Sequence, residues 1–323
     1  MEGSISNPVN IRIAVVTGGS RGIGLEVCRQ LSSNGIIVVL TAIDKEMAVE
    51  AVEKLKGQGL SNVLSHELNI TNASSVARLA DFLKTRFGKL DILVNNAAVS
   101  GVEYVQDPID GSTMSGEKAK LNKFILLMCT TQFTGMDRDQ RLEWFWRSVR
   151  ETYAAAKEGL QTNYYGTKRV IEALLNLLLA SSDGRIVNLS SDFGQLRLFR
   201  NEELKQELNN VEGLTEGRLD ELLDMFLKDF DAGTVEVRGW PAAFSAYKVS
   251  KAALNAYSRL LATKQPALCV NCVHPGYVKT DLTLQSGLLT PEEGASNVVK
   301  VALLPEGGVT GLFFEESMEA SFV

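Results

Sequence analysis

Tyr247 and Lys251 are the two residues whose types and spacing best suit acid–base chemistry. They stand four positions apart in a segment with an apolar stripe of helical period, so a helix would place both side chains on one face. A free tyrosine has a pKa of about 10 and is a poor proton donor near neutral pH. A lysine ammonium beside the phenol favours the phenolate, so we expect Lys251 to lower the pKa of Tyr247. For this spacing alone, the alternative is an ordinary pair on a helix surface.

Ser191 and Asn163 are polar residues set against predicted apolar elements. Ser191 follows the strand predicted over 185–189, where its hydroxyl would orient and polarise a carbonyl oxygen. Asn163 lies on the apolar face of a helix predicted from about 151 to 180, and a buried amide there needs partners. It either bridges backbone groups or holds a water that passes replacement protons to Lys251. The predicted catalytic set is Asn163, Ser191, Tyr247 and Lys251.

A glycine-rich stretch near the start of the chain indicates where a dinucleotide would bind. The apolar residues 13–16 precede Gly18, Gly22 and Gly24, and an apolar helical stripe and a strand over 36–40 follow. Such glycines let the chain turn sharply and let a ligand approach the backbone, while the N–H groups of the following helix face an anion. The spacing Gly-x3-Gly-x-Gly differs from the Gly-x-Gly-x-x-Gly fingerprint, so the strand–turn–helix context carries this prediction. The alternative is a tight turn that binds nothing.

The elements that must position these residues alternate between strand and helix. Further strands are predicted over 62–66, 90–94 and 267–273, and further helices over 47–56 and 73–87. This alternation predicts an α/β fold with a doubly wound parallel sheet of the Rossmann type, whose strands end at a common ligand-binding edge. We expect one domain over residues 1–323 with two helical insertions, at about 99–150 and 195–243, where the alternation lapses.

Composition excludes several classes of function. The 323 residues carry a net charge of −6 and no basic run, so nucleic acid is not an expected partner. The first residues lack a secretory pattern and no apolar run reaches membrane-spanning length, which predicts a cytoplasmic protein without membrane contact. Two histidines are too few for a histidine-rich metal site, so no metal is expected. Cys269 and Cys272 have redox-motif spacing but fall inside a predicted buried strand.

Six motifs along the chain together resemble one known family, the short-chain dehydrogenase/reductases. They are Thr17-Gly18-x3-Gly22-Ile23-Gly24, Asn95-Asn96-Ala97, Asn163, Ser191, Tyr247-x3-Lys251 and Pro275-Gly276-x-Val278-x-Thr280. The closer resemblance is to the subgroup of monomeric carbonyl reductases that includes plant salutaridine, menthone and isopiperitenone reductases. In that subgroup an insertion also separates the serine from the tyrosine and covers the surface used elsewhere for oligomerisation. The resemblance therefore implies a monomer with Tyr247 as acid and Ser191 as carbonyl binder.

The resemblance also implies a nicotinamide dinucleotide held by residues at the strand ends. The predicted cofactor-binding residues are Gly18, Ser20, Arg21, Gly22, Ile23, Gly24, Ala42, Asn69, Ile70, Asn95, Ala97, Tyr247, Lys251, Pro275, Gly276, Val278 and Thr280. NAD-preferring relatives carry an acid after the second strand, and NADP-preferring ones carry an arginine near position 43. This chain has Ala42 and Ile43 there, so Arg21 is the expected phosphate partner, with Lys45 a possible helper and Asp44 a possible opponent. We predict NADP(H).

Two departures from the family pattern concern the cofactor site. Ala98 replaces the usual glycine, and Asn69 replaces the usual aspartate after the third strand.

The expected substrate is a small, largely apolar ketone of terpenoid or alkaloid type, in a pocket walled by Phe193, Phe244, Tyr277 and the segment 102–104. One alternative is reduction of a conjugated C=C bond, although the relative that does this replaces the tyrosine with an acid. The other is a nucleotide-binding scaffold whose catalysis has decayed.

Overall fold

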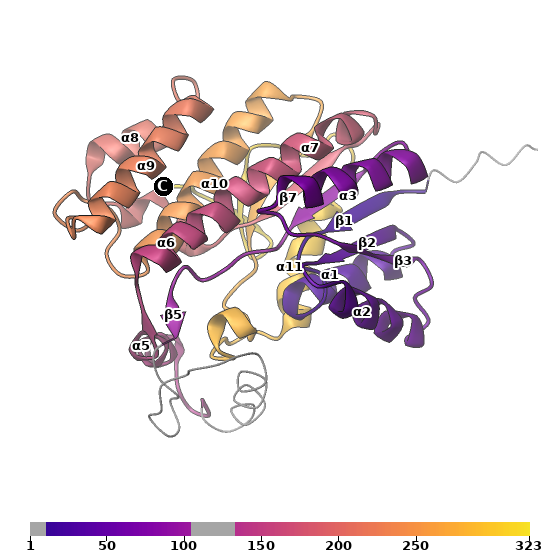
Figure 1. Ribbon diagram of the computed structural model, residues 1–323, viewed down its shortest axis with the longest axis horizontal. Helices are drawn as coiled ribbons and strands as arrows, with labels where there is room; N and C mark the ends of the chain where they lie inside the picture. The colour runs from indigo at the N-terminus through magenta and orange to yellow at the C-terminus, as the bar shows by residue number, and fades with distance from the viewer. Residues whose placement is uncertain (1–10, 105–132) are drawn as a thin grey trace, which may run out of the picture.

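The computed structural model describes residues 11–104 and 133–323, and an eight-stranded sheet lies at its centre (Figure 1). The strand order is β10-β9-β8-β7-β4-β1-β2-β3. Following the chain, β2 and β3 extend the sheet on one side of β1, and the strands from β4 onward extend it on the other side. Seven strands run parallel, and only β10 is antiparallel, to β9. The strands are β1 (Ile13–Val16), β2 (Ile37–Ala42), β3 (Val63–Glu67), β4 (Ile92–Asn95), β7 (Arg185–Leu189), β8 (Cys269–His274), β9 (Phe313–Glu315) and β10 (Met318–Ala320). The predicted doubly wound, mostly parallel α/β fold is confirmed.

Helices cover both faces of this sheet. One face carries α1 (Gly22–Ser33), α2 (Lys45–Gly57) and α11 (Pro291–Ala302), and the other carries α3 (Ala73–Arg86), α7 (Thr167–Leu179) and α10 (Ser245–Lys264) (Figure 1). Each face of the sheet forms a hydrophobic core with its helices, and alternate residues of β1 point to the two cores. Ala14 and Val16 pack with the first group of helices, and Ile13 and Val15 pack with the second. Because β1 is buried on both faces, all four of its residues are apolar.

The helix predicted from 151 to 180 is one helical run with a change of pitch in its middle. It consists of α6 (Tyr153–Leu160), a π-helical turn (Gln161–Gly166) and α7. A π turn holds an extra residue and is frequent at functional sites. Here it contains Asn163, whose side-chain bonds to other elements hold it in place. Apolar periodicity of a helical type does not reveal such a local widening.

The two segments where alternation lapses contain short elements of their own. The first includes β5 (Glu103–Tyr104), α5 (Arg138–Arg147) and β6 (Val149–Arg150), with β5 antiparallel to β6. Residues 105–132 of the predicted insertion, and Cys129 with them, lie outside the described residues. The second segment includes α8 (Glu202–Asn209) and α9 (Glu216–Asp231), and α9 buries an apolar face through Leu219, Leu222, Leu223 and Phe226. In the described ranges, no helix is both long and apolar enough to cross a membrane.

Candidate active site

Ser191, Tyr247 and Lys251 come together where β7 ends beside α10. Ser191 lies two residues beyond β7, while Tyr247 and Lys251 lie in the first two turns of α10. The Lys251 Nζ donates a hydrogen bond of 2.7 Å to the carbonyl oxygen of Leu189 in β7, which joins the helix to the strand end. The same Nζ lies 5.5 Å from the centre of the Tyr247 ring. The structure therefore brings together a phenol, an ammonium and a serine hydroxyl that are widely separated in the sequence.

The electrostatics of Tyr247 differ from the prediction. Burial raises the pKa of Tyr247 above its usual value, the Asp192 carboxylate raises it further, and a hydrogen bond with Ser191 acts in the opposite direction. Burial also lowers the pKa of Lys251, to about 8. The expected lowering of the Tyr247 pKa is therefore wrong for this structure, because the cost of burying a phenolate dominates. A raised pKa keeps the phenol protonated at neutral pH, as a proton donor requires.

Asp192 is a residue of this site that the sequence analysis did not select. Its Oδ1 accepts a hydrogen bond of 3.0 Å from the Ser191 hydroxyl, and its Oδ2 pairs with Arg138 of α5. The His274 Nε2 lies 3.8 Å from Oδ1. Burial acts to raise the pKa of Asp192, but His274 and Arg138 lower it below the usual value, so the side chain is a carboxylate. Asp192 directly follows Ser191 after the predicted strand, and this position is the signal in the sequence that could have identified it.

Asn163 has a partner for each group of its amide. Its Oδ1 accepts from the Val99 N–H at 2.9 Å, and its Nδ2 donates to the Val99 carbonyl at 3.0 Å and to the Ser250 hydroxyl at 3.1 Å. These bonds connect the loop after β4 to the π turn and to α10. The Asn163 side chain therefore bridges backbone groups, which was one of the two alternatives for it. A catalytic role for Asn163 stays a prediction.

The glycine loop lies between β1 and α1. Gly18 and Gly22 adopt left-handed backbone, with φ of 63° and 54°, which glycine allows at little cost. A Cβ on Gly24 would lie 2.3 Å from the Gly18 carbonyl oxygen and 2.5 Å from Nδ2 of Asn96. That amide of Asn96 donates to the carbonyls of Thr17 and Gly18, at 2.9 Å each, and so holds the loop. Asn96 was recognised only as part of a motif, and the structure gives it this supporting contact.

The start of α1 has the features that a diphosphate needs. Its N-cap residue, Arg21, makes no side-chain hydrogen bond to the first turn, in contrast to Asp44 at the start of α2. The first-turn N–H groups of α1 are therefore not capped by a side chain, and helix N-termini of this kind bind phosphate groups. Among the described residues, a Cβ on Gly22 would approach Thr280 alone, at 3.4 Å, so the loop after β8 faces the glycine loop across this point. The donor set fits the predicted dinucleotide.

Other predicted cofactor residues lie around the same strand ends. Ala42 ends β2, and Asn95 ends β4. The Asn95 Nδ2 donates to Asn188 at 2.8 Å within the sheet. The Asn69 Oδ1 accepts from the N–H and hydroxyl of Thr71, so this side chain caps the turn after β3. The remaining members are in the glycine loop, in the first turn of α1, in the turns after β3 and β4, or in the loop after β8, namely Ser20, Ile23, Ile70, Ala97, Pro275, Gly276 and Val278. Their contacts with a cofactor stay predictions.

Arg21 and its neighbours can be placed as well. The Arg21 guanidinium is 63% exposed and pairs with Asp281 at 2.7 Å. Asp44, the predicted opponent of a phosphate, accepts hydrogen bonds from the N–H groups of Glu46 and Met47, so its carboxylate caps its own helix. Arg21 is thus an exposed cation beside the glycine loop, and a phosphate group could replace Asp281 as its partner.

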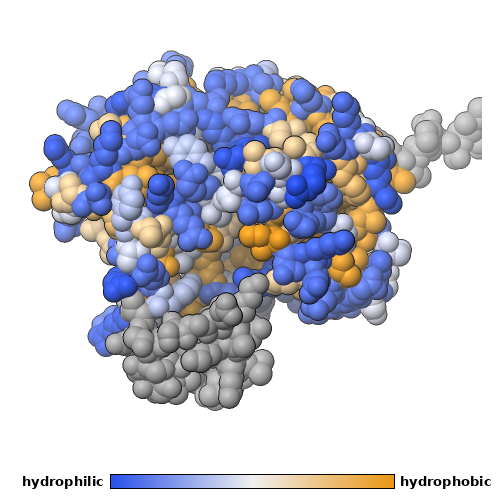
Figure 2. All heavy atoms as spheres, viewed as in Figure 1, coloured by the Kyte–Doolittle hydropathy of each residue, from blue (hydrophilic) through white to orange (hydrophobic). Residues whose placement is uncertain are grey.

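Tyr247 belongs to a cluster of aromatic side chains. The ring of Phe244 lies 4.9 Å from that of Tyr247, and the ring of Trp146 lies 5.1 Å from that of Phe244. Phe193 lies 6.1 Å from Phe244 and stacks on Trp146. Figure 2 shows a hollow between α6 and α11 with apolar side chains at its base. Of the predicted pocket residues, Phe193 and Phe244 therefore lie beside the candidate proton donor.

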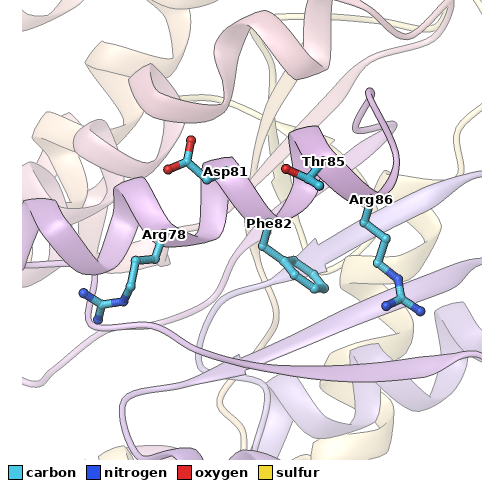
Figure 3. Close-up of a pocket in the computed structure, with 5 residues that line it drawn as sticks. All are labelled: Arg78, Asp81, Phe82, Thr85 and Arg86. Carbon is cyan, nitrogen blue, oxygen red and sulfur yellow. The ribbon is translucent and has the colours of Figure 1, made fainter.

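Two other features lie outside this site. A depression lined by Arg78, Asp81, Phe82, Thr85 and Arg86 is formed by one helix, α3, and contains no residue of the candidate site (Figure 3). Cys269 and Cys272 are free thiols in β8. Burial raises the pKa of Cys272 to about 12, so this thiol is not a reactive thiolate. The prediction that both cysteines lie in a strand is confirmed.

The chain belongs to the short-chain dehydrogenase/reductase family. The family model described as short chain dehydrogenase matches residues 12–136. A relative from Saponaria officinalis, short-chain dehydrogenase/reductase 1, is 45% identical over 96% of each chain. Human carbonyl reductase [NADPH] 3 is 35% identical over 91% of each chain. The resemblance inferred from the motifs is confirmed.

Two solved structures are similar over almost their whole length. Salutaridine reductase from Papaver somniferum is 44% identical, with a TM-score of 0.81 over 94% of this chain and 99% of that one. Menthone neomenthol reductase from Mentha piperita is 41% identical, with a TM-score of 0.76 over 95% of this chain and 99% of that one. The chain is therefore similar in sequence and fold to plant reductases of the subgroup that the motifs indicated.

Gly24→Ala is expected to weaken dinucleotide binding by tenfold or more, since its Cβ would collide with the backbone of Gly18 and displace the loop. The dissociation constant for NADPH, from quenching of tryptophan fluorescence, provides the measurement. Gly57→Ala is the matched control, because a Cβ there meets no atom of residues 11–104 or 133–323 within 4 Å. Unchanged affinity in Gly24→Ala would contradict the placement of the dinucleotide.

Proposed function

We propose that this protein is an NADPH-dependent reductase that converts a ketone of a small, largely apolar secondary metabolite, of terpenoid or alkaloid type, to an alcohol. The observation that carries the proposal is the convergence of Ser191, Tyr247 and Lys251 beside a cluster of aromatic side chains that includes Phe244. The names of the similar proteins, salutaridine reductase and menthone neomenthol reductase, support the substrate type.

The residues divide the work on a bound carbonyl as follows. The nicotinamide ring, when bound, supplies a hydride to the carbonyl carbon. Ser191 donates a hydrogen bond to the carbonyl oxygen, for which its hydroxyl must first turn away from Asp192. Tyr247 gives its phenolic proton to the same oxygen, which completes the alcohol. Lys251 then stabilises the phenolate that burial would otherwise disfavour.

Lys251 and the strand-end residues would also hold the cofactor. The glycine loop and the uncapped start of α1 would bind the diphosphate, and the loop from Pro275 to Thr280 would lie against the nicotinamide amide. Lys251 would bond the nicotinamide ribose in addition to its present bond to Leu189. We further propose that the protein acts as a monomer in the cytoplasm, in keeping with its resemblance to the monomeric subgroup. Light scattering of the purified protein tests the monomer.

Arg21→Gln is expected to reduce the preference for NADPH over NADH roughly tenfold, because hydrogen bonds between charged groups contribute about 1.5–3 kcal/mol and Arg21 is largely exposed. The ratio of kcat/KM with the two cofactors is the measurement. Arg29→Gln serves as the matched control, since Arg29 lies on the same helix but pairs with Glu26 and Glu292. A ratio that stays at the wild-type value in Arg21→Gln would mean that another residue selects the phosphate.

A panel of cyclic ketones and conjugated enones, assayed with NADPH and with NADH, tests the function as a whole. We expect consumption of NADPH with ketones and formation of the corresponding alcohols. Reduction of the C=C bond of enones alone would indicate the alternative reaction. Tight binding of NADPH without turnover of any member would indicate a scaffold without catalysis.

A further inference from the structure

The helix that carries Tyr247 begins with unusual backbone. Ala243 and Phe244, both of which have side chains, adopt left-handed conformations with φ of 49° and 56° just before Ser245, the first residue of α10. Left-handed backbone is unfavourable for residues with a Cβ and persists only where surrounding structure holds it. Phe244 is the N-cap residue and makes no side-chain capping bond. The first N–H groups of α10 therefore need another acceptor.

Glu151 supplies that acceptor from a distant part of the chain. Its Oε2 accepts from the Phe244 N–H at 2.8 Å, and its Oε1 accepts from the N–H and the hydroxyl of Ser245, at 2.6 Å each. Glu151 directly follows β6, which is paired with β5 in the first inserted segment. The carboxylate thus connects the end of that segment to the entry of the catalytic helix, across 93 positions of sequence.

A second hydrogen bond also holds the entry of α10. The Lys248 Nζ donates to the Ala242 carbonyl at 2.8 Å, one residue before the left-handed pair. Phe244 is buried, and its ring contacts the ring of Tyr247 at 4.9 Å with a tilt of 36°. The backbone conformation at 243 and 244 therefore determines where the Phe244 ring lies and how the first turn presents Tyr247.

We propose that Glu151 is a positioning residue for ketone reduction, whose carboxylate holds the left-handed entry of α10 and thereby fixes Phe244 and Tyr247 relative to the bound carbonyl. This inference rests on the proposed function, because turnover of a ketone is its main readout. Glutamine cannot fully replace the carboxylate, since it offers one acceptor oxygen and its NH2 group would face an N–H donor. The role is distinct from proton transfer, because Glu151 bonds the backbone of α10 and the Ser245 side chain.

Glu151→Ala tests this role in the full chain with NADPH and a ketone that the wild type reduces. We expect kcat to fall roughly 10- to 100-fold, as small displacements of reacting groups do, while the dissociation constant for NADPH stays unchanged. Glu158→Ala is the matched control, because this exposed glutamate lies on α6 and has no role at the entry of α10. It should retain the wild-type kcat.

Adding Ala243→Gly to Glu151→Ala separates positioning from a general loss of structure. Ala243 is exposed, and glycine adopts its left-handed conformation without the Cβ penalty. The second change is therefore expected to recover kcat by roughly threefold or more. A wild-type kcat in Glu151→Ala, or a double variant that recovers only its melting temperature, would overturn the proposal.

If Glu151→Ala does not fold, Glu151→Gln takes its place, with an expected loss of roughly threefold in kcat because it keeps the acceptor for Ser245. A wild-type kcat in that folded variant would overturn the proposal. If the wild type reduces no ketone, the proposed function fails and this role fails with it, whereas an active wild type with unaffected Glu151 variants removes this role alone.

Discussion

Tyr247→Phe is expected to lower kcat for ketone reduction by roughly 10²–10⁴-fold, the usual contribution of a positioned general acid. The substitution removes the phenolic proton and leaves the buried ring in contact with Phe244, so the site should keep its shape. The dissociation constant for NADPH should rise far less than kcat falls, because the substitution touches one predicted cofactor contact and leaves the glycine loop and the start of α1 unchanged. Steady-state rates and cofactor titration with the same preparation measure both quantities.

The matched control for this variant is Tyr257→Phe. Tyr257 lies on the same helix and is also buried, but it packs against Tyr164 away from Ser191 and Lys251. Its loss of a hydroxyl should leave kcat near the wild-type value. Equal rates for Tyr247→Phe and the wild type would show that another group donates the proton.

Lys251 is expected to cause a loss of reductase activity at alkaline pH. Burial lowers the pKa of Lys251 to about 8, so the ammonium is present below that pH and is lost as the pH rises through it. Tyr247 stays protonated across this range, since burial raises its pKa. The rate should therefore fall by about tenfold per pH unit above about 8, because the phenolate formed on proton transfer loses its cation. The pH profile of kcat measures this.

Two variants of Lys251 give the matched test of that profile. Lys251→Met removes the cation and is expected to cost roughly 10²–10³-fold in kcat at neutral pH, as the loss of one charge-stabilising group does in other enzymes. Lys251→Arg keeps a charge that does not titrate in this range, so its residual activity should lack the fall above about 8. An identical alkaline limb in the arginine variant would assign that limb to another group.

Much of the fold is predictable because its signals are local. The apolar residues of β1, the glycines that follow and the helical stripe of α1 are contiguous, and each step agrees with the next. The alternation of strands and helices then leads to the parallel sheet. The π turn at Asn163 is not predicted, because the apolar pattern across it is that of an ordinary helix, and the bonds of Asn163 to Val99 and Ser250 are long-range contacts.

The candidate site was predictable as a set of residue types but not in its electrostatics. Ser191 could be chosen because it follows a predicted strand, and Tyr247 and Lys251 because they share a helix face. The direction of the Tyr247 pKa could not, since it depends on how deeply the phenol is buried and on its distance from Asp192. Glu151 gave no signal in the sequence, because its partners at the start of α10 lie 93 and 94 positions away. Long-range contacts of this kind are the part that sequence patterns leave out.

Transfer of deuterium from NADPH labelled at the hydride-donating carbon of the nicotinamide tests the central claim most directly. The acceptor is a cyclic enone, which offers both a carbonyl and a conjugated C=C bond to the same site. With Ser191 and Tyr247 holding the carbonyl oxygen, we predict an allylic alcohol with deuterium on the carbinol carbon. A saturated ketone with deuterium on the β-carbon would contradict carbonyl reduction as the reaction of this site.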